Sequence, residues 1–255
     1  MRSSHKVVAT LSAVACAGFA GAGAASAAPG GLSGVHFASV LGSSRAPLVN
    51  SVSHGFAGWV FGKPAAGMTV RFKIPKLTCT SALRGVGPGA FMLTGPKTAP
   101  KTNGAGVLLE CFNGAPAAAA DVIVNNTETL DTTHSLFVGD LMKAVVTTSA
   151  TVTKATVSDL TSGHTFTFTK SGTGAASLEE LIIDDSLVNS SNQQLPVANF
   201  GTITYGMAAV GGVAIGNVTP QTAYDMRTST NVLQIQTGAI LTTAKNTFNT
   251  FWKHV

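Results

Sequence analysis

The stretch Thr165-Phe166-Thr167-Phe168-Thr169-Lys170 alternates threonine with phenylalanine and ends in a lysine. Successive side chains of a β-strand point to opposite faces, so the two phenylalanines would share one face and the threonines the other. This pattern is typical of an antiparallel strand with one face in a core and the other in water. The stretch therefore predicts a half-buried strand, and the rest of the chain can be compared with it.

Similar short runs recur on both sides of this stretch, separated by turn-forming pairs such as Asn113-Gly114 and Ser162-Gly163. The strands that we predict cover residues 58–61, 68–74, 106–111, 120–124, 144–157, 165–170, 178–184, 200–205, 232–236 and 247–252. Few stretches keep a helical period, although a short helix within residues 239–248 is one interpretation. Many short strands favour an all-β fold, an antiparallel β-sandwich of two large sheets with a lectin-like layout.

Two segments interrupt this pattern. Residues 144–157 do not alternate strictly, so we expect a bend or a bulge in that strand. The cluster Gly85-Val86-Gly87-Pro88-Gly89 lacks the spacing of a dinucleotide-binding loop, and we interpret it as an ordinary loop.

The first residues read as a secretory signal peptide. Arg2 and Lys6 precede an apolar run, and small residues follow it up to Ala27. We predict a signal peptide over residues 1–27, a flexible Gly/Ser/Ala-rich lead-in over residues 28–50, and one β-sandwich domain over residues 51–255. An uncleaved membrane anchor is the alternative. We expect the mature protein to be secreted, monomeric and free of the membrane.

The composition excludes several classes of protein. The chain has 255 residues, of which 45% are hydrophobic and only 11% are charged, which argues against disorder. Its net charge of +5 falls by two when Arg2 and Lys6 leave with the leader, so no nucleic-acid partner is expected. His54, His134 and His164 are scattered in the sequence, and we expect them to be solvated. We therefore predict no metal and no cofactor, with convergence of these histidines as the alternative.

Two cysteines, Cys79 and Cys111, remain once the leader with Cys16 is removed. In an exported protein such a pair most simply forms one disulfide. A metal site is the rival interpretation, but two cysteines this far apart lack any zinc-binding spacing.

The acidic group Glu179-Glu180 and Asp184-Asp185 brackets three apolar residues. In a strand, Glu180 and Asp184 share one face and lie about 13 Å apart, too far to share a proton. On the residues alone, a strand with a solvated polar face is favoured. A catalytic carboxyl that works with a neighbouring strand is the alternative.

The order of several segments resembles the glutamic peptidases, or eqolisins, from about His54 to the C terminus. The segments that carry the resemblance are Phe56-Ala57-Gly58-Trp59-Val60, Phe72-Lys73-Ile74-Pro75-Lys76-Leu77-Thr78-Cys79, Gly106-Val107, Cys111-Phe112-Asn113-Gly114, residues 178–185 and residues 195–205. The resemblance implies two antiparallel sheets with a substrate cleft on a concave sheet, and it supports the pairing of Cys79 with Cys111. It also implies an acid peptidase in which a glutamate handles protons and a glutamine amide stabilises the oxyanion.

The family's catalytic residues carry over only in part. Glu180 best matches the glutamate, Asp184 stands at the motif's second acid, and Gly104 stands at the glutamine position. Glycine has no amide side chain, so the oxyanion donor is missing unless Asn103 replaces it. No glutamine precedes Gln193. The family's cleft tryptophan and aspartate are missing from residues 90–95, and its aromatic residues are missing from residues 118–123.

Three functional hypotheses remain open. The first is a secreted glutamic-peptidase-like protein with lost or much reduced activity that binds a polypeptide or another extracellular ligand. The second is an active acid endopeptidase with Glu180 as general acid and base. The third is an unrelated lectin-like binding module.

Overall fold

A computed structural model describes residues 35–37, 51–62, 64–96, 99–171, 177–189, 191 and 193–253. The expected leader lies outside these residues, and so does most of the expected lead-in. Three residues of that lead-in form strand β1 (Val35–Phe37), which pairs antiparallel with β13 (Leu187–Asn189).

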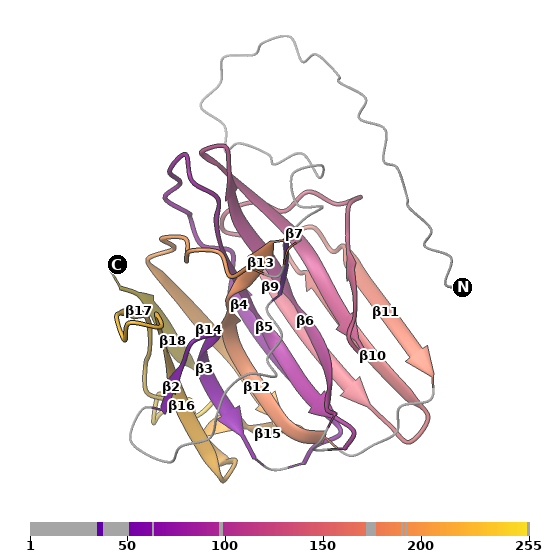
Figure 1. Ribbon diagram of the computed structural model, residues 1–255. Helices are drawn as coiled ribbons and strands as arrows, with labels where there is room; N and C mark the ends of the chain where they lie inside the picture. The colour runs from indigo at the N-terminus through magenta and orange to yellow at the C-terminus, as the bar shows by residue number, and fades with distance from the viewer. Residues whose placement is uncertain are drawn as a thin grey trace, which may run out of the picture.

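The fold is a sandwich of two β-layers joined along one continuous hydrogen-bonded path (Figure 1). The first layer has the strand order β11-β10-β9-β4-β14, and the second has the order β16-β3-β12-β5-β6-β7-β8; β18 and β17 connect them. Among the strands that the structure describes, neighbours pair antiparallel except for the short β2, which pairs parallel to β16. The predicted all-β sandwich is confirmed.

The strand bounds follow the alternating sequence pattern. The first layer contains β4 (Gly67–Lys73), β9 (Leu141–Thr148), β10 (Val152–Asp159), β11 (Thr165–Ser171) and β14 (Thr202–Val210). The second contains β3 (Phe56–Phe61), β5 (Arg84–Thr94), β6 (Lys101–Phe112), β7 (Ala115–Val124), β8 (Thr127–Leu130), β12 (Ser177–Asp185) and β16 (Gln221–Arg227). The remaining elements are β2 (Ser51–Ser53), β15 (Val213–Ala214), β17 (Leu233–Thr237), β18 (Phe248–Trp252) and the 3-10 turn η3 (Ile215–Asn217).

Side chains from the inner faces of both layers form the main core. Val70 of β4 and Val146 of β9 meet Ala105 and Val107 of β6 there, and all four are fully buried. Phe166 and Phe168 of β11 pack against this core while the threonines between them stay exposed, as their alternation predicts. A second cluster lies on the outer face of the second layer and includes Phe91 and Leu181. The second layer is therefore buried on both faces.

Three local predictions are wrong. Residues 144–157 belong to two strands, β9 and β10, joined by a tight turn at Ser149. Residues 85–89, expected as a loop, are part of β5, where glycine permits close packing: a Cβ at Gly89 would lie 2.6 Å from the carbonyl oxygen of Ala105. Residues 239–247 form a loop with one turn and no helix, and Phe248 begins β18.

The predicted disulfide is present. Cys79 and Cys111 are bonded, with their Cα atoms 5.3 Å apart, and the bond ties the segment after β4 to the end of β6. Among the described residues, none lies in a helix long and apolar enough to cross a membrane.

Candidate functional site

The acidic strand β12 lies in the middle of the second layer, between β3 and β5 (Figure 1). Its side chains alternate as predicted, with Glu180 and Asp184 on the inner face and Asp185 on the outer face. The expectation of a solvated polar face is wrong, since all three of these residues are completely buried. Carboxyl groups without water retain their protons more readily, so burial decides the chemistry of this strand.

Glu180 is held by groups inside the sandwich. Its Oε1 atom accepts a hydrogen bond from the backbone N–H of Ala65 at 2.8 Å and contacts the hydroxyl of Ser177. Burial raises the pKa of Glu180, and these two hydrogen bonds oppose the rise only in part. The side chain thus connects β12 to the segment after β3, and it faces the core between the layers.

Asp184 links the two layers through a tyrosine. Tyr205 of β14 lies in the opposite layer, and its hydroxyl is within hydrogen-bond distance of both the Asp184 carboxyl and the carbonyl oxygen of Ile183, the latter at 2.9 Å. Burial raises the pKa of Asp184 to about 7. In acid, a protonated Asp184 can donate to the tyrosine oxygen while the tyrosine donates to Ile183, which satisfies all three groups.

Gly104 lies on the opposite face of the second layer from Glu180. It pairs with Phe91, which pairs with Leu181, whereas Glu180 lies in the next row with Met92 and Asn103. Alternate residues of a strand face opposite ways, so Glu180 and the position of the family glutamine do not meet at one site. The catalytic role of Glu180 stays a prediction that rests on the resemblance.

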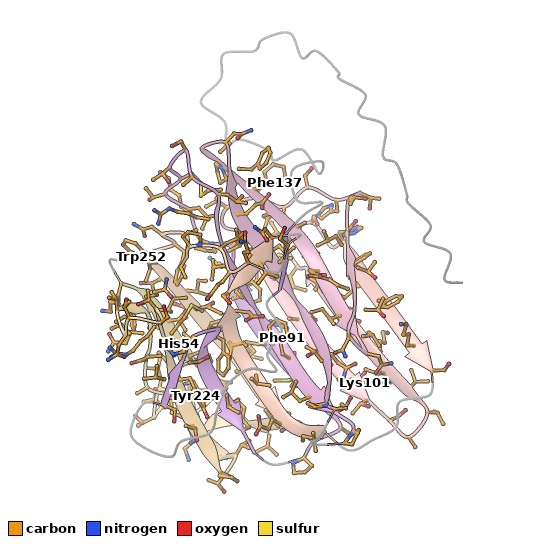
Figure 2. All side chains as sticks on the ribbon, in the orientation of Figure 1. His54, Phe91, Lys101, Phe137, Tyr224 and Trp252 are labelled. Atoms are coloured by element: carbon orange, nitrogen blue, oxygen red, sulfur yellow. A yellow bond between two sulfur atoms is a disulfide. The ribbon has the colours of Figure 1, made fainter. Side chains whose placement is uncertain are left out.

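The ring of Phe91 covers the position of Gly104. A Cβ atom added at Gly104 would lie 2.5 Å from Cδ1 of that ring, and the ring is fully buried in the middle of the layer (Figure 2). No side chain fits at residue 104 unless Phe91 moves. An amide donor is therefore missing, and so is the space for one.

Asn103, the possible substitute for the glutamine, is engaged elsewhere. Its amide donates a hydrogen bond to the hydroxyl of Thr94 at 2.9 Å, and its side-chain oxygen accepts one from the backbone N–H of Asn125 at 2.8 Å. The side chain is fully buried on the inner face. It joins three strand ends and lies two strands away from Glu180.

A set of carboxyls that the sequence analysis missed occupies the outer face of the second layer. We name Glu110, Asp121, Glu128 and Asp185 the outer carboxyl set; they come from β6, β7, β8 and β12. Glu110, Asp121 and Asp185 are completely buried. One signal was present in the sequence, because Glu110 and Asp121 are single acids inside otherwise apolar runs.

Burial keeps three of these carboxyls, those of Glu110, Asp121 and Asp185, neutral in acid. It raises the pKa of Glu110 to about 7, and neither Glu110 oxygen has a hydrogen-bond partner within the described residues. Burial also raises the pKa of Asp121 well above its usual range, and the neighbouring Glu128 carboxyl raises it further. Burial does the same for Asp185, with a smaller contribution from the charge of Glu128. Asp121 and Glu128 are within hydrogen-bond distance of each other, so the two carboxyls can share a proton.

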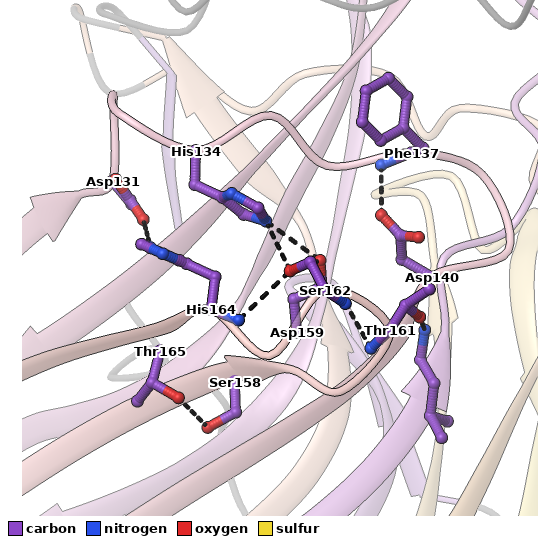
Figure 3. A network of polar contacts seen from close by, with 11 residues as sticks. Asp131, His134, Phe137, Asp140, Ser158, Asp159, Thr161, Ser162, His164 and Thr165 are labelled. Carbon is purple, nitrogen blue, oxygen red and sulfur yellow. Dashed lines mark hydrogen bonds and ion pairs between the residues drawn. The ribbon is translucent and has the colours of Figure 1, made fainter.

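A second polar network lies at the end of the first layer (Figure 3). The rings of His134 and His164 stack with their centroids 4.2 Å apart, and each contacts one aspartate: His134 Nε2 lies 3.0 Å from Asp159, and His164 Nε2 lies 2.7 Å from Asp131. These two histidines are therefore paired, contrary to expectation. No group of three or more metal-ligating side chains occurs in the part of the chain that the structure describes.

Ser162 completes this network without forming a catalytic triad. Its hydroxyl donates to Asp159 at 2.6 Å, and the same His134 nitrogen faces both Ser162 and Asp159. A triad needs the histidine to contact its serine and its aspartate through different ring nitrogens. The network instead joins the loop of residues 131–140 to the turn between β10 and β11.

Comparison with known proteins supports the fold. The model of the peptidase A4 family matches residues 22–251. Scytalido-glutamic peptidase, solved with a transition state analog inhibitor, is 15% identical with a TM-score of 0.61, over 80% of this chain and 100% of that one. SCP-B, an eqolisin in a complex with the tripeptide Ala-Ile-His, is 16% identical with a TM-score of 0.60, over 80% of this chain and 100% of that one.

Aspergilloglutamic peptidase from Aspergillus niger is 21% identical with a TM-score of 0.53, over 67% of this chain and 99% of that one. No curated protein matches the sequence. The family match extends over most of the chain. The chain belongs to the peptidase A4 family.

Proposed function

We propose that this protein is an exported member of the peptidase A4 family that binds polypeptides and has lost efficient peptide-bond hydrolysis by the glutamate–glutamine mechanism. Export follows from the signal-peptide pattern of residues 1–27. The polypeptide ligand is suggested by the family and by its solved members in complex with peptides. Membership of this family also excludes the hypothesis of an unrelated lectin-like module.

One observation carries the loss of activity. Gly104 offers no amide, and the ring of Phe91 occupies the space that such a side chain would need. Removing one oxyanion donor typically lowers the rate by about a hundred- to a thousandfold. Glu180 adds to this argument because it is buried on the other face.

An apolar groove offers a surface for an extended polypeptide. It has a volume of about 440 Å³ and lies beside the disulfide, between the segment of Ile74 to Cys79 and the loop that holds Phe137 and Val138. These last two side chains are 41% and 48% exposed, and Phe137 lies at one end of the sandwich (Figure 2). Exposed apolar side chains beside a groove are typical of binding sites.

The second candidate function is an acid peptidase that uses different carboxyls. The observation that favours it is the outer carboxyl set, in which the carboxyls of Asp121 and Glu128 contact each other. Burial and this contact raise the pKa of Asp121. A carboxyl that holds its proton can act as a general acid.

Proteolysis of a denatured protein substrate between about pH 2 and pH 7 separates these functions. We expect no hydrolysis by the folded, disulfide-bonded protein, and no difference between it and the Glu180→Gln and Asp121→Asn variants. Acid activity that disappears in Glu180→Gln would establish a divergent glutamic peptidase. Activity that disappears only in Asp121→Asn would place the chemistry in the outer carboxyl set.

Binding is tested with a fluorescent denatured polypeptide and anisotropy. We expect the wild-type chain to bind it and Phe137→Ser to bind about tenfold more weakly, since a large apolar contact is lost. Phe112→Ser is the matched control, because Phe112 is similarly exposed but does not line the groove. Equal affinity of both variants and the wild type would remove the groove from the proposal.

A further inference from the structure

A second hollow lies on the first layer, far in the fold from the outer carboxyl set. It has a volume of about 460 Å³. The hollow lies where β14 separates from β4, next to Gly206 and Arg71, the last paired residues at that end of the two strands. Residues of β4 and β14 line it, together with Leu141 of β9 and with Ile74 and Pro75, which it shares with the apolar groove. None of these residues figures in the family resemblance as a catalytic or cleft position.

Two cations line this hollow and a third adjoins it. Arg71 and Lys73 line it from β4, and Lys143 of β9 lies directly opposite Arg71 in the antiparallel pair. Like charges directly opposite each other on one face destabilise a sheet. Within the described residues, none of the three makes an ion pair or a side-chain hydrogen bond. The acid next to β9 is Asp140, whose carboxylate accepts a hydrogen bond from the backbone N–H of Phe137 at 2.7 Å. This carboxylate therefore stabilises the loop of residues 131–140 and does not pair with the three cations.

The other wall of the hollow combines hydroxyls with an exposed apolar side chain. Thr202 and Thr204 of β14 are exposed and line the hollow. Met207 follows them at a break in the pairing of β14 with β4, with a φ of 51° and a side chain that is 56% exposed. A left-handed backbone at a bulky residue is unfavourable, and such outliers and bulges concentrate at functional sites.

We infer that this hollow binds an organic oxyanion, a phosphate or carboxylate group attached to a partly apolar body. The anionic group would lie between Arg71, Lys73 and Lys143, where a guanidinium can donate two parallel hydrogen bonds and the ammonium groups add charge. The threonine hydroxyls supply further donors. The apolar body would lie on Met207 and Leu141. This site does not depend on the proposed loss of peptidase activity.

Calorimetric titration tests the inference with three probes: inorganic phosphate, phenyl phosphate and uncharged phenol. The titration is made at low salt and at about pH 6, where phosphate carries more than one negative charge on average. We expect phenyl phosphate to bind more tightly than inorganic phosphate, because the ring can contact Met207, and phenol not to bind. Benzoate then tells whether a carboxylate replaces the phosphate.

Variants locate the binding. Arg71→Gln should weaken phenyl phosphate about tenfold, because one charge-assisted contact is lost. Lys154→Gln, on the same outer face but outside the hollow, and Lys101→Gln, on the other layer, should change the affinity by less than about twofold. Equal weakening by all three variants, or no binding of any anionic probe, would overturn the site. Inorganic phosphate binding as tightly as phenyl phosphate would overturn the apolar part of the ligand.

Lys143→Thr separates a binding role from a structural one. It removes the repulsion with Arg71, so we expect the unliganded variant to unfold at the same temperature as the wild type or a higher one. The same variant should bind phenyl phosphate about tenfold more weakly. A variant that loses stability and keeps its affinity would show that Lys143 serves the fold alone.

Discussion

The outer faces of the two layers carry ionisable groups of opposite kinds, basic groups in contact with water on the first layer and buried carboxyls on the second. On the first layer, Lys73 and Lys154 are exposed and Arg71 is half-buried. On the second, Glu110 and Asp185 are completely buried. Exposed cations keep their charge at little energetic cost and stay available to a ligand. Buried carboxyls hold their protons instead, so the second layer makes stability depend on pH while the first layer offers a binding surface.

The largest effect expected from this contrast is a loss of stability as the pH rises. Burial raises the pKa of Glu110 and of Asp184 to about 7. A carboxyl with a raised pKa in the folded state contributes its full stability below its unfolded pKa, and this contribution is lost as the pH rises through about 7. From about pH 4 to pH 8, each group should lower the free energy of unfolding by on the order of 3 kcal/mol. Urea unfolding at both pH values measures the change.

Asp184→Asn sharpens the same experiment. An amide cannot ionise, so the variant should lose less stability than the wild type between acid and neutral pH, although it weakens the link to Tyr205 at any pH. Equal pH dependence of the two proteins would mean that Asp184 is not the group whose ionisation matters. A wild-type stability that does not change with pH would contradict the buried, neutral state of the whole second layer.

The next effect concerns the outer face of the second layer alone. Restoring the family's residue by Gly104→Gln should lower the free energy of unfolding by about 2 kcal/mol, because the new side chain meets the ring of Phe91. It should not produce peptidase activity, since Glu180 stays on the other face. Acid hydrolysis by this variant would show that the two positions can meet. Thermal unfolding and the peptidase assay are made on the same preparation.

A smaller effect probes the connection between the layers. Tyr205→Phe leaves the carbonyl oxygen of Ile183 and the carboxyl of Asp184 without the tyrosine hydroxyl. The loss should lower the free energy of unfolding by about 1.5 kcal/mol at acid pH. Tyr224→Phe is the control, because the hydroxyl of Tyr224 has no hydrogen bond in the described part of the chain. The two variants are compared by urea unfolding. Equal stability would mean that water replaces the lost hydroxyl.

Local sequence patterns predicted the strands well where alternation was clean. The threonine and phenylalanine stretch became β11 with the expected faces, and the cysteines formed the expected disulfide. The glycine cluster of β5 was misread because glycine usually marks turns. Here glycine is required because residues distant in the sequence leave no room for a side chain. A Cβ atom at Gly85, for example, would lie 2.5 Å from Cδ1 of Leu187. Such contacts cannot be seen in a local pattern.

The candidate site was harder to predict, for two physical reasons. The two faces of β12 were assigned correctly, but their burial was not, because a strand sequence does not reveal what covers its outer face. The resemblance placed Glu180 and Gly104 in one site, whereas the strand register puts them on opposite faces. Register depends on pairing between strands, and a shift of one residue reverses every side chain.

The smallest expected effect concerns the first layer. There the free energy of unfolding should fall as the pH falls, the opposite of what is expected for the second layer. Burial alone would raise the pKa of Asp159, but hydrogen bonds from Ser162, His134 and two backbone N–H groups lower it to about 2. A lowered pKa gives stability that is present above the unfolded pKa and is lost as the pH falls through about 2. Asp159→Asn should therefore lower the free energy of unfolding by about 1 kcal/mol near pH 5 and change it little below about pH 2. Urea unfolding at both pH values measures the difference. A variant that is destabilised equally at both pH values would mean that the network of His134 and Ser162 acts through its shape and not through the aspartate charge.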